Sequence, residues 1–333
     1  MSHSAVLSSR IRLARNYEDL PFDANREGVA ATCVSRTANA LALSGEDGGF
    51  RLLTMSALGE DGRMLLAESH LISQDLTRFA DSAVLLREED RVSVMMGEED
   101  HLRIQALTPG LHLNETAARC FAVDDALSRH VRFAYDPQLG YLTALPTDTG
   151  TGMRASLLMH LPMLAHHKQM GSVGQIAAKV GLTARGFYGE GSEALGDIYL
   201  ISNQVTLGRT EDEIIATVTA LGEQLTGMEA ELRAHAMKER RLQTEDRIWR
   251  AWALMHNARL MPLNEFYGLW SSVRLGAVLG QLDVDLDILD TLPVEVQDAH
   301  LRQRSKNSLT GEALDAARAR RVRSLIRPNN LTA

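Results

Sequence analysis

The sequence predicts an α+β fold, in which a largely antiparallel sheet is flanked by helices and followed by a helical C-terminal domain. Several strand-like runs follow one another without a helix between them, an order that favours antiparallel pairing over alternating βαβ units. Beyond about residue 210 the apolar residues change to a period of 3.6. We therefore expect a first domain over residues 1–215 and a helical C-terminal domain over residues 216–333.

The elements follow from the spacing of apolar residues between turn residues. Strands are predicted at 5–14, 50–58, 63–72, 82–89, 91–96, 101–107, 140–145 and 196–207. Helices are predicted at 25–43, 114–131, 153–170 and 172–182. A further helix is expected to begin after Thr210, because acids occupy the first turn behind this candidate N-cap.

Composition narrows the class of protein. With 333 residues, 45% of them hydrophobic and 23% charged, the chain is an ordinary soluble globular protein, and its net charge of -8 argues against a general nucleic-acid binder. Cys33 and Cys120 form no CxxC pair, and no signal-peptide pattern opens the chain, so we expect a reducing cytoplasm and no structural zinc. No apolar run approaches the roughly 18 residues of a membrane span, so no membrane partner is predicted.

Two arginines alternate with apolar residues in "SSRIRLAR". In a strand, Arg10 and Arg12 point to one face, while Ile11 and Leu13 point to the other. Two guanidinium groups side by side repel each other unless an anion joins them. The alternative is a solvated strand face.

A glycine-rich turn, "LPTDTGTGMRAS", precedes the predicted helix at 153–170. Gly150 and Gly152 permit positive φ, so that backbone amides and the helix N-terminus face an anion, to which Arg154 adds a formal charge. The glycine spacing matches neither a P-loop nor a dinucleotide fingerprint. An ordinary loop with an exposed arginine remains the alternative.

A second glycine-rich segment, "ARGFYGEGSEALGD", displays Glu190 and Glu193 behind Arg185. Three glycines in so short a span suit a mobile loop that closes over a ligand and brings carboxylates to it. The alternative is a surface loop rich in turn residues.

The stretch "VSVMMGEEDHLRIQ" breaks a strand at Gly97, shows three acids, and resumes with Arg103. With the segments above, it completes a set of five arginines near strand ends or glycine loops. Such a set indicates phosphoryl transfer, because arginine binds phosphate in a bidentate manner and the reaction needs mainly positioning and charge neutralisation. Acids facing a nucleotide phosphate would be repelled, so they indicate a cationic acceptor or bound Mg²⁺ on the other side of the site.

These segments carry a family resemblance. In order, "SSRIRLAR", "ESHLIS", "GEEDHLRIQ", "GYLTALPTDTGTGMRAS" and "RGFYGEGSEALGDIYLISNQVTLG" resemble the catalytic domain of the ATP:guanido phosphotransferase, or phosphagen kinase, family over about residues 4–215. The family fold, an antiparallel sheet flanked by helices, agrees with the predicted strand order. Family members that act on free creatine or arginine carry an additional N-terminal helical domain. This sequence starts almost at the first motif, so it is most similar to the bacterial protein-arginine kinases.

The resemblance implies roles for individual residues. Glu99 matches the carboxylate that holds and helps to deprotonate the acceptor guanidinium, whose pKa of about 12 or more makes proton removal difficult. Glu190 and Glu193 match the other catalytic acids. The implied ATP site consists of Ser8, Ser9, Arg10, Ile11, Arg12, His70, Arg103, Arg154, Ala155, Ser156, Leu157, Leu158, Arg185, Gly186, Phe187, Tyr188, Gly189 and Glu190. ATP with Mg²⁺ is implied, without a protein-bound metal site.

Two positions depart from the family pattern in the catalytic domain. Leu145 replaces a cysteine expected beside the substrate guanidinium, where a thiolate would stabilise charge. Gly97 stands where the family usually has asparagine, and is expected to loosen the turn that holds Glu99. From Leu145 we expect reduced activity.

The helical domain of the protein-arginine kinases implies dimerisation and phosphoarginine binding. The family's binding motif is retained at Asp315, Arg318 and Ala319, whereas Leu314 replaces its first arginine. A lost guanidinium removes a bidentate phosphate contact, so phosphoarginine sensing is expected to be weaker.

Other conspicuous residues of the chain have structural interpretations. Trp249, Trp252 and Trp270 are expected to anchor the core or a homodimer interface. His160, His166 and His167 lie on the predicted helix at 153–170 without an acid or cysteine at ligand spacing, so no metal is assigned to them.

Three functions remain open. The first is an ATP-dependent kinase of arginine side chains in proteins, which marks them for a Clp-type protease or silences a repressor in a stress response, with an activator protein. The second is a degenerate, weakly active homologue that serves as a binding or adaptor protein. The third is a kinase of a free small guanidino compound. The arginines and three glutamates favour the first, whereas Leu145 and Leu314 favour the second.

Overall fold

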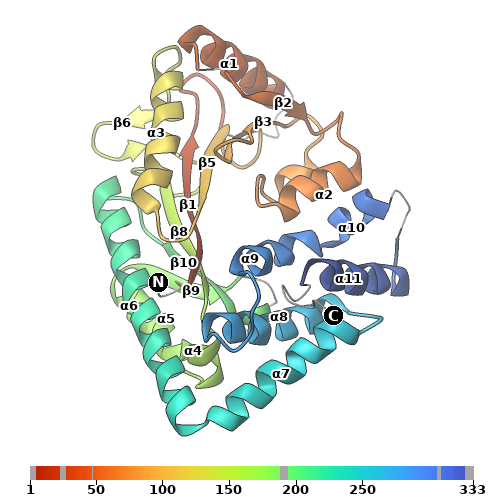
Figure 1. Cartoon of the computed structure of the whole chain (residues 1–333). Helices are drawn as coiled ribbons and strands as arrows, with labels where there is room; N and C mark the ends of the chain where they lie inside the picture. Colours follow the sequence, from red (N-terminus) through yellow and green to blue (C-terminus); the bar gives the residue numbers. More distant parts are fainter. Residues whose placement is uncertain (1–4, 23–27, 47, 188–193, 306–308, 327–333) are drawn as a thin grey trace.

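A computed structural model describes residues 5–22, 28–46, 48–187, 194–305 and 309–326 of the chain. Its centre is an eight-stranded sheet with the strand order β2-β3-β4-β5-β1-β8-β10-β9, in which every neighbouring pair is antiparallel. Six helices, α6 to α11, follow the sheet in sequence (Figure 1). The predicted α+β class, with a largely antiparallel sheet and a helical C-terminal part, is confirmed.

The bounds of the elements are as follows. The strands of the large sheet are β1 (Val6–Arg15), β2 (Arg51–Thr54), β3 (Ala83–Arg87), β4 (Val92–Met96), β5 (Leu102–Pro109), β8 (Met153–His160), β9 (Leu182–Gly186) and β10 (Ile198–Asn203). A small hairpin pairs β6 (Tyr135–Asp136) with β7 (Gly140–Tyr141). The helices of this part are α1 (Val29–Ser44), α2 (Glu60–Glu68), η1 (Leu76–Arg78), α3 (Leu113–Ser128), α4 (Pro162–His166), α5 (Met170–Lys179) and η2 (Leu195–Asp197). The C-terminal helices are α6 (Glu211–Glu239), α7 (Arg241–Asn257), α8 (Leu263–Val278), α9 (Leu286–Glu295), α10 (Asp298–Ser305) and α11 (Glu312–Leu325).

The two faces of the sheet differ in polarity, as the alternation in β1 predicts. Ile11 and Leu13 are fully buried on one face, in a core that α1, α3 and α6 share. Burying each such side chain contributes about 1.5–3 kcal/mol relative to leaving it exposed. Arg10 and Arg12 lie on the opposite face. The apolar core therefore holds the sheet rigid while its other face stays available for polar side chains.

The prediction of a helix over 153–170 is wrong for its first half. Residues 153–160 form β8, between β1 and β10, and α4 begins only at Pro162. Small and apolar residues recur in this segment at spacings that fit both a helix and a strand, so the sequence is ambiguous. Pairing with two neighbouring strands makes the segment a strand. Arg154 consequently lies within a strand and not at a helix N-terminus.

The predicted strand at 63–72 is also wrong. Residues 60–68 form α2, with Glu60 and Asp61 in the first turn, where acids stabilise the helix dipole. Leu66 packs one face of α2 against Met95 of β4 in a separate small core. A short apolar run of this kind fits either period, and only the packing partner distinguishes them.

The predicted helix start at Thr210 is confirmed. The Thr210 hydroxyl accepts a hydrogen bond from the Glu213 amide at 3.2 Å, and the Glu213 carboxylate accepts one from the Thr210 amide at 3.0 Å. This capping box stabilises the start of α6, which then runs unbroken to Glu239. The domain boundary predicted after residue 215 therefore falls in the first turns of α6 and stays a prediction.

The C-terminal helices pack around Trp270, which is fully buried and donates its indole N–H to the Leu289 carbonyl at 2.7 Å. Trp249, in contrast, is 51% exposed. The chain then returns to the first part, where the Glu68 carboxylate of α2 accepts hydrogen bonds from the backbone and imidazole of His300 in α10. In Figure 1, α10 consequently lies beside α2. Among the helices of the described residues, none is long and apolar enough to cross a membrane.

Candidate active site

The polar face of the sheet brings the predicted arginines together. Arg12 of β1 lies directly across from Arg154 of β8, and Arg10 lies across from Ser156, whose hydroxyl accepts a hydrogen bond from the Arg10 Nε at 3.3 Å. Burial, followed by the positive charges of Arg103, Arg185 and Arg154, lowers the pKa of Arg10 to about 10. Cations from four strands therefore converge on one patch of this face.

Another member of this cluster is Arg12. Its Nε is buried without a hydrogen-bond partner among the described residues. Burial, followed by the charges of Arg10, Arg103 and Arg154, holds the pKa of Arg12 well below its usual range. A buried donor without an acceptor is costly, and a phosphate oxygen would supply the acceptor and the missing negative charge.

The acidic turn between β4 and β5 is tightly built. Gly97 has φ 79°, and its amide donates to the His101 carbonyl at 3.0 Å. A Cβ at this glycine would lie 2.8 Å from the Cβ of Ala30 in α1. Glycine therefore fits a left-handed, crowded position, and this packing does not support the expectation that Gly97 loosens the turn.

Two further residues of the turn connect it to neighbouring segments. Asp100 is buried and accepts hydrogen bonds from the Asn16 side chain at 2.7 Å and the Ala144 amide at 2.8 Å. The His101 amide donates to the Asn16 side chain, and its ring Nδ1 accepts from the Tyr17 amide at 2.9 Å. Burial lowers the pKa of His101, which keeps the imidazole neutral in this role. Asp100 and His101 thus hold the turn in place.

Glu98 and Glu99 face different surroundings. Glu98 is 3% exposed and forms an ion pair with Arg103 and a hydrogen bond with the Ser73 hydroxyl. Glu99 is exposed, and its carboxylate lies 3.7 Å from the Arg103 guanidinium. Burial raises the pKa of Glu99, and the neighbouring acids raise it further, against the attraction of Arg103. Glu98 therefore fixes Arg103, and Glu99 is left accessible beside it.

Leu145 lies in a loop that adjoins this turn. It is 41% exposed, and its carbonyl accepts a hydrogen bond from the Thr143 hydroxyl at 2.7 Å. Asp148, three residues on, accepts a hydrogen bond from Arg154 at 2.6 Å. The loop is therefore linked to both the arginine cluster and the acidic turn, through Arg154 and through the amide of Ala144.

A cavity of about 680 Å³ opens beside the cluster, between the sheet and the C-terminal helices. Ser8, His70 and Leu158 line it on one side, and Asp287, Asp290 and Glu295 of α9 line it on the other. A smaller hollow continues from it to the cluster and is lined by Ser8, Arg10, His70, Leu107, Ser156, Leu158, Phe187 and Leu200. The larger volume lies within the usual range for small-molecule and cofactor pockets, about 300–1,000 Å³.

His70 stands at the junction of the two hollows. It has φ 60°, its ring contacts the edge of Phe187 at 5.2 Å between centroids, and its carbonyl accepts a hydrogen bond from Gln105 at 2.9 Å. Burial, followed by the positive charge of Arg10, lowers the pKa of His70 to about 4. The ring is therefore neutral near pH 7 and presents an aromatic surface to the cavity.

Several predicted site residues lie elsewhere. Ile11, Ala155 and Leu157 are fully buried in the apolar core, on the face opposite the arginines. The Ser9 hydroxyl is occupied on that side as well, donating to the Gly110 carbonyl at 2.8 Å. Tyr188, Gly189, Glu190 and Glu193 lie outside the described residues. In the predicted strand segments, therefore, every second side chain reaches the polar face of the sheet. The side chains between them lie in the apolar core.

Some residues of the site escaped the sequence reasoning. Ser73 and Asn16 contact Glu98 and Asp100 from distant parts of the chain, and no local pattern marks them. Asp148 contacts Arg154 from only six residues away. Gln105 was detectable in principle, since it lies two residues beyond Arg103 on the same face of β5. The described residues contain no group of three or more His, Cys, Asp or Glu positioned for a metal ion.

The residues of the phosphoarginine motif lie on α11. The Arg318 guanidinium is buried, and it donates to the carboxylates of Asp298 at 2.6 Å and Asp315 at 2.7 Å and to the Val296 and Met261 carbonyls. Leu314 is buried, and Ala319 belongs to the core of the helical part. Arg318 is thus engaged within the C-terminal helices in this structure.

Comparison with known proteins agrees with this geometry. The family profile described as "ATP:guanido phosphotransferase, C-terminal catalytic domain" matches residues 32–232, and the profile "Protein-arginine kinase McsB C-terminal domain" matches residues 241–332. Proteins named protein-arginine kinase are similar over nearly the whole chain. The one from Caldanaerobacter subterraneus subsp. tengcongensis is 41% identical over 95% of each chain, and the one from Moorella thermoacetica is 42% identical over 96% of this chain and 93% of its own.

Solved structures of guanidino kinases share the fold. A duplicated taurocyamine kinase from Schistosoma mansoni has a TM-score of 0.61 and 24% identity, over 69% of this chain and 34% of its own. Lombricine kinase has a TM-score of 0.59 and 24% identity, over 69% of this chain and 67% of its own. From the two profiles and the relatives of about 40% identity, we conclude that the chain belongs to the ATP:guanido phosphotransferase family, among its protein-arginine kinases.

Proposed function

We propose that this protein transfers the γ-phosphoryl group of ATP to the guanidinium groups of arginine side chains in proteins. The observation that carries the proposal is the meeting of a cluster of arginines with the Glu98–Glu99 turn at Arg103. A cationic patch suits the triphosphate, and an accessible carboxylate beside it suits a cationic acceptor. The relatives named protein-arginine kinase support a protein-bound acceptor.

In this proposal the arginines bind the phosphates of ATP. Arg10, Arg12 and Arg154 are held side by side by the pairing of β1 with β8, so they already share one face of the sheet when the nucleotide arrives. Their mutual repulsion is relieved by the triphosphate, which strengthens binding. The adenosine would occupy the 680 Å³ cavity against His70. Arg103 and Arg185 would extend the cationic patch toward the γ-phosphate.

Mg²⁺ is proposed to arrive with the nucleotide. Its usual ligands in such sites are substrate phosphates and water with one or two carboxylates. Bound in this way, the ion would neutralise charge on the phosphates. The residues of the chain supply the remaining interactions.

Glu99 is proposed to hold the acceptor guanidinium and to take its proton as the phosphoryl group arrives. Its raised pKa makes it a better proton acceptor than an ordinary glutamate, and its exposure leaves it accessible to a side chain of another protein. Glu98 would act indirectly by fixing Arg103. Glu190 and Glu193, outside the described residues, are proposed as further catalytic acids.

The wider role follows from the family. We propose a cytoplasmic homodimer, assembled through the helical domain over residues 216–333, that acts in a stress response. Its marked proteins would pass to a Clp-type protease, and an activator protein would control it. Asp315, Arg318 and Ala319 remain the proposed phosphoarginine-binding residues. To bind phosphoarginine, the buried Arg318 would have to release the carboxylate of Asp298 and pair with the phosphate instead.

A weakly active adaptor is the second candidate function. Leu145 favours it, because this exposed side chain in the loop beside the acidic turn offers neither charge nor a hydrogen bond to a guanidinium. Leu314 also favours it, since a buried leucine cannot bind phosphate.

One assay separates the candidates. The protein is incubated with γ-labelled ATP and either an arginine-rich protein or free arginine, and acid-labile, nitrogen-linked phosphate is measured. We expect transfer to the protein that is lost in Glu99→Gln and kept in Glu88→Gln, an exposed glutamate paired with Arg51 on the sheet.

The outcomes are distinct. ATP binding without transfer, by both the wild type and Leu145→Cys, would favour the adaptor. Transfer to free arginine alone would favour a kinase of small guanidino compounds. A strong rise in rate in Leu145→Cys would show that the leucine limits an existing activity.

A further inference from the structure

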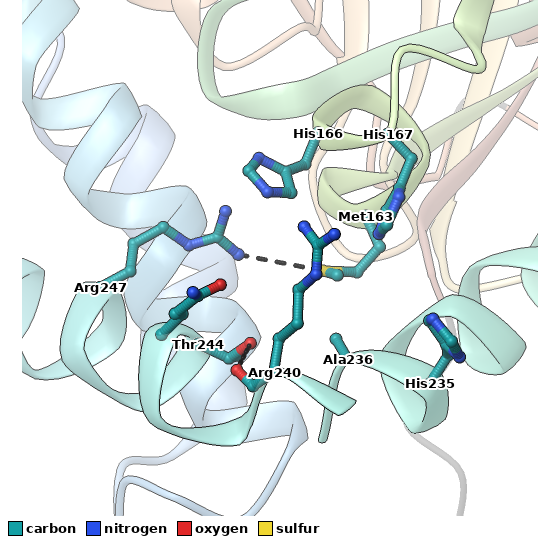
Figure 2. A pocket seen from close by; sticks show the side chains of 9 residues that line it. Met163, His166, His167, His235, Ala236, Arg240, Thr244 and Arg247 are labelled. Carbon is teal, nitrogen blue, oxygen red and sulfur yellow. Dashed lines mark hydrogen bonds between the residues drawn. The ribbon is translucent and has the colours of Figure 1, made fainter. Parts of the chain in front are cut away.

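Helices α6 and α7 meet at an elbow next to α4 (Figure 1), and a basic cavity lies there (Figure 2). Its volume is about 160 Å³. The lining residues are Met163, His166, His167, His235, Ala236, Arg240, Gln243, Thr244 and Arg247, and none of them carries a carboxylate. The cavity shares no lining residue with the proposed nucleotide site. It therefore concentrates cationic side chains in a place that the proposed phosphoryl transfer does not use.

Arg247 is the clearest sign of a missing partner. Its Nε is buried and has no hydrogen-bond partner among the described residues. Its terminal nitrogen contacts the Met163 sulfur at 3.8 Å, a weak acceptor. In Figure 2 the side chains of Arg247, Arg240 and His166 point into the same space. A guanidinium aimed into a cavity without a carboxylate is poised for an anion from solution.

The amino end of α7 adds to the positive charge. The helix has 17 residues and begins at Arg241, where no side chain caps it and no acid stands in the first turn. The unpaired amides of such a terminus and the helix dipole both favour an anion. This contribution is independent of the side chains, because it comes from the backbone.

Two acids, Asp197 and Glu229, act on Arg247, and both are already engaged. The Glu229 carboxylate accepts hydrogen bonds from the amides of Met163 and Leu164, and Asp197 accepts one from the Ser271 hydroxyl at 2.5 Å. Their attraction does not offset burial, which lowers the pKa of Arg247.

His166 lies in the same electrostatic field. Burial lowers the pKa of His166, and the charges of Arg247, His167 and Arg240 act in the same direction, opposed by Asp197. The space among these side chains is therefore electropositive even though carboxylates lie nearby.

We propose that this cavity binds a phosphate group, as free inorganic phosphate or as a phosphate monoester, between Arg240, Arg247 and the amino end of α7. Planar guanidinium groups match phosphate oxygens in pairs, and a helix N-terminus is a common phosphate site. The residues that line the cavity come from α4, which follows β8 in sequence, and from α6, α7 and the elbow between them. A bound phosphate would therefore connect α4 to the C-terminal helices. The site stands independently of the proposed kinase function.

Calorimetry tests the proposal. The full-length protein is first saturated with a non-hydrolysable ATP analogue, so that the catalytic arginines are occupied, and is then titrated with inorganic phosphate or with O-phosphoserine. We expect one phosphate per chain, bound at least about tenfold more weakly by Arg247→Met and by Arg240→Gln, since each removes a charge-assisted contact. Arg250→Met is the matched control, because Arg250 lies on the same helix, 76% exposed, and pairs with Asp246.

The results decide the proposal and its ligand. Equal binding of both phosphates assigns a monoester site, and binding of inorganic phosphate alone assigns a site for the free ion. Wild-type affinity in both Arg247→Met and Arg240→Gln, or no binding by the wild type at millimolar phosphate, would overturn the proposal. Arg240 is exposed, so Arg240→Gln preserves the test if Arg247→Met fails to fold.

Discussion

Replacing Glu98 by glutamine tests whether this buried carboxylate fixes Arg103. The Glu98 side chain is 4% exposed and the Arg103 side chain 16% exposed, so their ion pair lies largely out of water. After the substitution, the more distant carboxylate of Glu99, at 3.7 Å, is the one ion-pair partner that Arg103 keeps among the described residues. The side-chain volume and the oxygen facing Ser73 are preserved, so the change removes charge with little loss of packing.

The magnitude follows from this geometry. Removing one partner of a buried ion pair costs about 3–5 kcal/mol, and the retained amide oxygen recovers part of this, so we expect a loss of about 2 kcal/mol in the free energy of unfolding. A displaced Arg103 should also slow phosphoryl transfer by about 10- to 100-fold, because small errors in position have large kinetic effects.

Glu88→Gln provides the control for this experiment. Glu88, in the turn after β3, and Arg51 of β2 form an ion pair with side chains 66% and 62% exposed, so its loss should change stability by less than about 1 kcal/mol. Urea denaturation gives the free energies, and the labelled-phosphate assay gives the rates. If Glu98→Gln matches Glu88→Gln in both measurements, the buried pair does not position Arg103 and the reasoning fails.

Three further predictions concern the same face. Gly97→Ala should destabilise the protein by about 1–3 kcal/mol, through positive φ and the contact with Ala30, and Ala30→Gly should partly restore the double variant in urea denaturation. Because the pKa of His70 falls from 6.5 to about 4 on folding, the unfolded chain binds the proton more readily. The folded state should therefore lose stability as the pH falls from 6.5 toward 4. Over this range, the free energy of unfolding should decrease by about 1–3 kcal/mol more in the wild type than in His70→Gln. Arg12→Met should raise the melting temperature at low salt, by removing a repelled buried cation, yet weaken ATP binding at least about tenfold in a titration. A lower melting temperature with unchanged ATP affinity would contradict the last prediction.

Features with local causes were predictable from the sequence. The alternation of Arg10 and Arg12 with Ile11 sorts the two faces of β1 through the period of two that any strand imposes. The capping box at Thr210 needs only residues three apart. The arginine set and the acidic turn were likewise visible, because strand ends and glycines mark where side chains gather.

Other features required the tertiary structure. The segment 153–160 fits a helix or a strand by itself, and its pairing with β1 and β10 decided the outcome. The separate roles of Glu98 and Glu99 depend on Ser73, 25 residues away from Glu98 in sequence, which gives one carboxylate a buried setting and leaves its neighbour exposed. The sequence by itself therefore determined which side chains of β1 share a face, since that follows from the periodicity of a strand. Only the tertiary structure decided which charges are buried and paired, since burial and pairing depend on contacts between segments far apart in the chain.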